Sequence, residues 1–139
     1  LLRCSAKELK YLFISRNEIG DKGIEALVPA FTNCNRLEQL YLSNNPSITT
    51  RGWQSLASIL ESPNSNLHVL FITRNNINDE AVVSLAKALG NNRTLQTLNT
   101  NGNPIAAIGW QAFSKILCST SSINATFLSN PSLWNVGSE

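Results

Sequence analysis

The sequence predicts an α/β fold: a right-handed solenoid, shaped like a fragment of a horseshoe, with a parallel sheet on its concave face and helices on its convex face. Three observations lead to this prediction. A short pattern, seen first from Leu9 to Asn17, recurs through the chain at a nearly constant spacing. Apolar and polar residues alternate inside each copy, which is typical of a strand. Apolar residues at helical spacing follow each copy, so the repeating unit is one strand and one helix.

The strands are predicted from the first half of each repeat. Apolar residues two positions apart, such as Leu40 and Leu42, point to the same face of a short strand. Strands joined by a crossover helix run parallel, with right-handed crossovers. A helix is wider than the strand spacing of about 4.8 Å, so the sheet should take the concave side. Four good copies and a degenerate fifth start near Leu9, Leu37, Leu67, Leu95 and Ile123.

The second half of each repeat predicts an amphipathic helix. Leu27 and Phe31 illustrate the helical spacing in the first copy, and residues equivalent to Leu27 should fill the core. We expect Asp21, Thr50 and Asp79 to act as helix N-caps. A small residue recurs in the first turn and should let each helix approach the strand layer closely. The small residues are Gly23, Gly52, Ala81 and Gly109.

Asparagine is unusually frequent, with 18 of the 139 residues. Four asparagines stand where a strand turns away from the sheet, and the turn leaves backbone N–H and C=O groups without ladder partners. A carboxamide both donates and accepts hydrogen bonds, so one asparagine per repeat can satisfy neighbouring turns. The asparagines predicted to have this structural role are Asn17, Asn45, Asn75 and Asn103.

The repeated pattern resembles the leucine-rich repeat, L-x-x-L-x-L-x-x-N-x-L, over nearly the whole chain. Its period and helical second half are similar to the ribonuclease-inhibitor-like subclass. A longer period, two repeats in length, is superimposed, because the segment around Trp53 recurs around Trp110. We expect both tryptophans to pack between helices. The chain should form one domain over residues 1–139 and be part of a longer protein, because solenoid ends need polar caps that are not visible here. Uncapped ends also allow self-association.

The register also predicts which side chains face solvent on the concave sheet. Aromatic residues fall at outward strand positions, where folding alone would not place them. Contiguous exposed apolar surface usually marks an interaction site, and Tyr, Phe and Arg are favoured at interfaces. The alternative is cross-strand stacking that only stabilises the sheet, and both can hold. The residues predicted to bind a partner are Tyr11, Phe13, Arg16, Tyr41, Phe71, Arg74 and Phe127.

Composition and motif content exclude several classes of function. The formal charge is only +2, no basic patch is present, and no apolar run could span a bilayer, so neither nucleic acid nor membrane is an expected partner. His68 is the only histidine, and no catalytic set can be assembled around it. Cys4, Cys34 and Cys118 lack metal-ligand spacing. We therefore expect no catalytic residue, no metal and no cofactor.

The sequence thus predicts a protein-recognition module that binds a protein partner through its concave sheet face. The resemblance leaves two alternatives. One is a regulator of an enzyme, similar to GTPase-activating proteins or ribonuclease inhibitors. The other is the ligand-sensing repeat region of an immune-receptor-like protein. The low, odd cysteine count favours a cytoplasmic location, whereas glycosylation sequons at Asn92 and Asn124 favour secretion.

Overall fold

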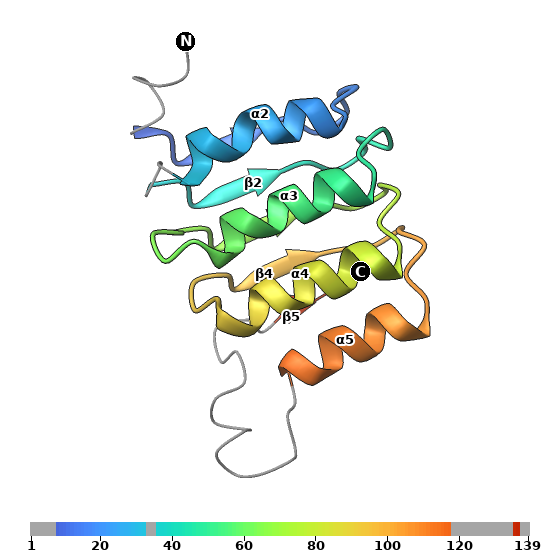
Figure 1. Ribbon diagram of the computed structural model, residues 1–139. Helices are drawn as coiled ribbons and strands as arrows, with labels where there is room; N and C mark the ends of the chain where they lie inside the picture. The colour runs from blue at the N-terminus through green and yellow to red at the C-terminus, as the bar shows by residue number, and fades with distance from the viewer. Residues whose placement is uncertain (1–7, 33–35, 118–134, 137–139) are drawn as a thin grey trace.

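The computed structural model describes residues 8–32, 36–117 and 135–136. Helices lie side by side in one layer, and the strands form a second layer behind them (Figure 1). This arrangement confirms the predicted α/β solenoid. The elements in chain order are β1 (Tyr11–Phe13), α2 (Asp21–Thr32), β2 (Gln39–Tyr41), α3 (Thr50–Glu61), β3 (Val69–Phe71), α4 (Asp79–Asn91), β4 (Thr97–Asn99), α5 (Ala107–Leu117) and β5 (Asn135–Val136).

The sheet is parallel, with its strands in sequence order from β1 to β5. Its register aligns the inward leucines of successive repeats, so that Leu40 pairs with Leu70 and Leu70 with Leu98. All three are buried against the helices. None of the described helices covers the opposite face (Figure 1). We call it the open sheet face and define it by the outward residues Tyr11, Phe13, Gln39, Tyr41, Val69, Phe71, Thr97 and Asn99.

The fifth strand differs from the prediction. The sequence pattern places Ala125 opposite Thr97, whereas in the structure Asn135 pairs with Thr97 and Val136 with Leu98. The expected strand carries Thr126 at its inward position, where earlier repeats have leucine, and a threonine there buries less apolar area. Several residues singled out from the sequence lie outside the described part of the chain. They are Cys4, Cys34, Cys118, Asn124 and Phe127.

The core lies between the two layers. Leu56, Leu85 and Phe113, one helical turn after the small-residue positions, are buried as predicted. The two equivalent tryptophans differ: Trp53 is fully buried, whereas Trp110 is 45% exposed and makes a tilted ring contact with Phe113 at 5.9 Å between centroids. Helix α3 packs between α2 and α4, whereas α5 packs against α4 on one side. The prediction that Trp110 packs between helices is therefore wrong.

The asparagines form a ladder at the ends of the strands. The Asn45 side chain is fully buried, and its Oδ1 accepts from the N–H groups of Asn17 at 3.1 Å and Ile19 at 3.3 Å. Its Nδ2 donates to the carbonyls of Ile14 at 3.1 Å and Leu42 at 2.8 Å. The amide therefore joins its own turn to the turn of the preceding repeat, and it supplies partners for backbone groups that the strand ladder does not reach.

The same bonding recurs along the ladder. Asn75 Oδ1 accepts from the N–H of Asn45, and Asn103 Oδ1 accepts from the N–H of Asn75 at 2.9 Å. Asn17 differs because its side chain is exposed and donates only to the carbonyl of Ser15 at 3.1 Å, among the residues described. The ladder is thus buried at Asn45 and Asn75 and half-buried at Asn103.

Helix N-termini are capped differently from the prediction. The N-caps of α3 and α4 are Thr49 and Asn78, each one residue before the expected Thr50 and Asp79. Both caps have extended backbones, which frees their side chains to accept from the first turn. Asp21 is already the first residue of α2. Residues that the pattern marked as caps are thus the first helical residues, and their side chains reach the neighbouring repeat.

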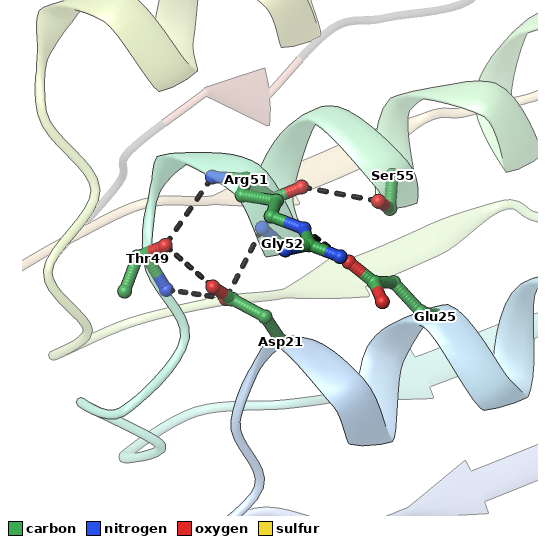
Figure 2. A network of polar contacts seen from close by, with 6 residues as sticks. All are labelled: Asp21, Glu25, Thr49, Arg51, Gly52 and Ser55. Atoms are coloured by element: carbon green, nitrogen blue, oxygen red, sulfur yellow. Dashed lines mark hydrogen bonds and ion pairs between the residues drawn. The ribbon is translucent and has the colours of Figure 1, made fainter.

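Asp21 caps the next helix instead of its own. Figure 2 shows its carboxylate at the N-terminus of α3, where Oδ1 accepts from the N–H groups of Thr49 at 2.8 Å and Gly52 at 3.1 Å. The Thr49 hydroxyl donates to Oδ2 at 2.6 Å. Asp79 repeats this contact by accepting from the N–H of Ala106 at 2.7 Å, just before α5. The negative charge of each aspartate also interacts favourably with the positive N-terminal end of the following helix dipole.

This capping contact makes stability depend on pH. The Thr49 hydroxyl, together with the N–H groups of Thr49 and Gly52, holds the pKa of Asp21 below its ordinary value of 3.8. A depressed carboxyl pKa contributes stability that is present above the unfolded value and is lost as the pH falls through the lower folded value. We expect Asp21→Asn to be less stable than wild type near neutral pH, with a difference in stability that narrows as the pH falls below 3.8.

Urea unfolding at a series of pH values measures this gap. Glu18→Gln removes an exposed carboxylate on the preceding loop and serves as the control, for which no such narrowing is expected. A gap between wild type and Asp21→Asn that stays constant across the acid range would contradict the inter-repeat role of the charge.

Candidate protein-binding surface

Three rings stack along the open sheet face. The register places Phe13 opposite Tyr41 and Tyr41 opposite Phe71 on adjoining parallel strands. Their ring centroids lie 4.5 Å and 4.9 Å apart, with interplanar angles of 20° and 13°. We call these three residues the aromatic column. Each stacked pair contributes about 1 kcal/mol beyond area burial, so the column stabilises the sheet whatever else it does.

The column is unequally exposed along its length. Phe13 is 67% exposed and Tyr11, on the same strand, is 47% exposed, whereas Tyr41 and Phe71 are half-buried. The Tyr41 hydroxyl donates to Gln39 Oε1 at 3.0 Å, which holds that ring in place. The surface at β1 therefore offers apolar area that folding leaves uncovered, next to rings whose positions are set by stacking.

A row of left-handed residues borders the column at the carboxyl ends of the strands. Arg16, Asn44, Arg74 and Gly102 have φ values of 59°, 58°, 51° and 71°. The N–H groups of three of them continue the hydrogen bonding between neighbouring repeats beyond the strands. Arg16 donates to the Ser43 carbonyl at 2.8 Å, Asn44 to the Thr73 carbonyl at 2.9 Å, and Arg74 to the Asn101 carbonyl at 2.8 Å. Asparagine and glycine adopt this conformation readily, whereas arginine does so at a cost of about 1 kcal/mol.

Charge differs between the two ends of the strands. At the amino ends, Lys10 Nζ lies 3.3 Å from Glu38 Oε1, and the half-buried His68 precedes β3. At the carboxyl ends, Arg16 and Arg74 are exposed and form no ion pair with any residue in the described ranges. The amino ends of the strands thus carry a paired cation, whereas the carboxyl ends carry two arginines that are unpaired within those ranges, with the exposed Glu18 two residues after Arg16.

The positive φ row is a feature that sequence reasoning missed. Arg16 and Arg74 were predicted as surface residues, but nothing in their identity indicates a left-handed backbone. The signal was present at the equivalent positions, because Asn44 and Gly102 are residue types that favour positive φ.

The side chain of the glycosylation sequon residue Asn92 is buried and hydrogen-bonded in the fold. Asn92 is buried, its Nδ2 donates to the Leu60 carbonyl at 2.9 Å, and its Oδ1 accepts from the N–H groups of Thr94 at 3.0 Å and Leu95 at 2.7 Å. A glycan on this nitrogen is incompatible with those contacts. Asn92 therefore links the segment between α4 and β4 to the C-terminal end of α3 in the folded protein.

In the described ranges, no group of three or more His, Cys, Asp or Glu side chains is placed to hold a metal ion. None of the helices described there has the length and apolar character that crossing a bilayer requires.

Comparison with known proteins agrees with this architecture. The family described as Leucine Rich repeat matches residues 8–28 and 64–86. The chain is 32% identical over 126 residues to NACHT, LRR and PYD domains-containing protein 13 of Homo sapiens, which covers 89% of this chain. It is 37% identical over 92 residues to NACHT, LRR and PYD domains-containing protein 5 of Mus musculus, which covers 66% of this chain. The chain spans only 12% and 8% of the lengths of these relatives.

Two solved structures share the fold. Leiomodin-1 actin-binding site 2 has a TM-score of 0.77 at 14% identity, with coverage of 98% of this chain and 73% of that one. The tropomodulin C-terminal domain of Caenorhabditis elegans has a TM-score of 0.74 at 20% identity, with coverage of 99% and 78%. The Leucine Rich repeat match and the two relatives, together with the repeated strand-and-helix units and the asparagine ladder, show that the chain is a leucine-rich repeat protein.

Proposed function

We propose that this chain is a protein-recognition module whose partner binds the open sheet face over Tyr11 and the aromatic column. The observation that carries the proposal is the exposure of Phe13 and Tyr11 beside two further rings. Exposed aromatic rings lower solubility, and clustered ones are typical of interaction surfaces. The similar leiomodin-1 structure is that protein's actin-binding site 2, so there the fold serves to bind a protein.

The column is well suited to binding because it is preorganised. Its rings are restrained by stacking at 4.5 Å and 4.9 Å and by the bond from Tyr41 to Gln39. Ordering side chains on association costs about 0.5–1.5 kcal/mol each, and restrained rings avoid most of that cost. Stacking and binding are therefore complementary roles of the same residues.

A second candidate function is favoured by the names of the relatives. Both relatives are named for NACHT, LRR and PYD domains, and one aligns with most of this chain. The chain would then be the ligand-sensing repeat region of a receptor-like protein.

The ribonuclease-inhibitor-like subclass fits the nearly constant spacing of the copies and their well-formed helices, each about three turns long.

Site-specific photo-crosslinking tests the proposed surface. A benzophenone amino acid replaces Phe13 in the full chain, and in a matched variant it replaces Val83, which is 45% exposed on α4. We expect defined crosslinked species in a native lysate from position 13 and none from position 83. Equal crosslinking from both positions would contradict a binding surface on the sheet.

A pair of double variants measures the contribution of the rings. Tyr11→Ser with Phe13→Ser removes the most exposed aromatic area, and Val83→Ser with Ile108→Ser removes comparably exposed apolar side chains from the helices. We expect the first pair to weaken capture of the crosslinked partner by about tenfold or more, as loss of an aromatic anchor does. The second pair should leave capture unchanged, and the reverse pattern would move the interface to the helices.

A further inference from the structure

We infer that the partner of the open sheet face presents an acidic segment, with carboxylates that pair with Arg16 and Arg74 and an apolar or aromatic side chain that contacts the aromatic column. This inference rests on the proposed function and specifies the chemistry of the partner. Four observations carry it: the backbone conformation of the two arginines, their lack of ion pairs within the described residues, their equivalent positions after β1 and β3, and the stacking of the rings on those strands.

The fold by itself does not favour arginine at these two positions. Arg16 and Arg74 have φ values of 59° and 51°, and the same row holds Asn44 at 58° and Gly102 at 71°. The second and fourth repeats thus use residues that adopt a left-handed backbone readily, whereas the first and third repeats place an arginine there against its preference. Strained backbone that persists in a structure is typical of functional positions.

The surface cations of the described ranges include paired and unpaired groups, and Arg16 and Arg74 are among the unpaired ones, together with Lys22 and Lys87. Lys10, Arg36 and Arg51 each form an ion pair, with Glu38, Glu8 and Glu25 respectively. Over residues 8–32 and 36–117, Arg16 and Arg74 have no such partner. Their charge is therefore available to a carboxylate from another molecule, which an arginine can bind through two parallel hydrogen bonds.

The arginines project from the same level of the solenoid. They follow β1 and β3 at equivalent positions and share one backbone conformation, so their Cα atoms are about 10 Å apart, two strand spacings. Gly102 leaves room for the stem of Arg74, because a Cβ at Gly102 would lie 2.9 Å from Arg74 Cγ. The backbones of Arg16 and Arg74 thus stand at equivalent, separate places beyond the carboxyl ends of β1 and β3.

The rings indicate a protein segment and not a nucleic acid. Single-stranded nucleic acid is held by bases that stack on open aromatic faces. Within the column, Tyr41 is stacked on both faces, at 4.5 Å from Phe13 and 4.9 Å from Phe71, so bases cannot stack on each ring in succession. The ring edges and the exposed Phe13 instead suit aliphatic and aromatic side chains, which contact such surfaces without separating the rings.

Binding of defined polymers tests the inference. The full chain is titrated with a copolymer of glutamate and tyrosine, with polyglutamate, and with polyuridylate, at low and raised salt. We expect the glutamate–tyrosine copolymer to bind most tightly, with an affinity that falls as salt increases. Tighter or equal binding of polyglutamate would overturn the role of the column, and arginine-dependent binding of polyuridylate at equal affinity would overturn the choice of a protein segment.

The variants use the chain's own alternative for this row. Arg16→Asn with Arg74→Asn copies the residue found at Asn44, and Lys22→Gln with Lys87→Gln removes the same charge from exposed positions on α2 and α4. We expect the asparagine pair to weaken copolymer binding by about tenfold for each guanidinium, with a melting temperature equal to or above that of wild type. The lysine pair should bind like wild type.

The result separates this inference from the proposed function. Equal loss of copolymer binding in the two charge variants would overturn the specific role of the arginines. If crosslinking from position 13 persists in the Arg16→Asn, Arg74→Asn variant, the sheet face still binds a protein and only the acidic chemistry is wrong. If position 13 gives no crosslinks in the wild-type chain, the proposed function itself fails.

Discussion

Replacing Asn45 by alanine is expected to lower the free energy of unfolding by about 3 kcal/mol or more, because each buried polar group that loses its partner costs about 1–3 kcal/mol. The change leaves the N–H groups of Asn17 and Ile19 and the carbonyl of Ile14 without their side-chain partner. The Leu42 carbonyl loses one of its two side-chain donors and keeps Asn75 Nδ2 at 3.3 Å. Urea unfolding measures the loss as a lower midpoint with an unchanged slope.

Asn17→Ala is the matched control for that experiment. Asn17 occupies the same position of the first repeat, but its exposed side chain makes a single bond, to the Ser15 carbonyl, among the residues described. We expect this variant to lose about 1 kcal/mol or less. Similar losses for the two variants would show that burial in the ladder is not what makes Asn45 important.

Gly52→Ala is the second large effect, with an expected loss of about 2–3 kcal/mol. A Cβ on Gly52 would lie 2.5 Å from Asp21 Oδ1 and 2.6 Å from Ile48 Cγ2. The new methyl group must therefore displace the carboxylate that caps α3, or the isoleucine that precedes it. Thermal unfolding followed by circular dichroism measures the loss as a lower melting temperature.

Gly90→Ala supplies the contrast because it adds the same methyl group to a helix without a close contact. A Cβ there would meet Ile116 Cγ2 at 3.9 Å, an ordinary van der Waals distance. Replacing a helical glycine by alanine then stabilises by about 0.5–1 kcal/mol. A stabilised Gly52→Ala variant would refute the close approach described above.

The glycine contact also explains the longer, two-repeat period of the sequence. At Gly109, a Cβ would lie 2.7 Å from Asp79 Oδ1, so an aspartate at the start of an odd-numbered repeat's helix again faces a glycine in the next helix. At the junction between α3 and α4 the chain has Thr50 and Ala81 instead, and Thr50 Oγ1 donates to Asn78 Oδ1 at 3.2 Å. Two kinds of junction alternate, which is why equivalent residues recur in pairs of repeats.

The expected close approach of helix to strand layer at these glycines therefore needs correcting. The nearest atoms to a Cβ at Gly52 belong to Asp21 and Ile48, which lie on the preceding helix and the preceding loop. A sequence pattern reveals that a small residue recurs, but it does not reveal which neighbour requires the space. For Gly52, the neighbour that requires the space is Asp21, which belongs to the preceding repeat and is identified only from the tertiary contacts.

Much of the candidate surface could be predicted from local rules. Side chains alternate between the faces of a strand, so the period alone determined that Phe13, Tyr41 and Phe71 share the outward row and that the leucines between them point inward. Nearly equal repeat lengths also determined that these residues would lie level with one another. The sequence by itself thus determined the solenoid, its parallel strands and the membership of its rows.

Tertiary structure decided the properties that arise between repeats. The ring distances, the left-handed backbone of Arg16 and Arg74, and the capping of α3 by Asp21 each depend on how one repeat rests on the next. The unequal burial of Trp53 and Trp110 has the same origin, since similar local sequences are flanked by different helices. The physical reason is that the periodic pattern depends on residues close together in the sequence, whereas burial, backbone strain and capping depend on contacts between residues of different repeats.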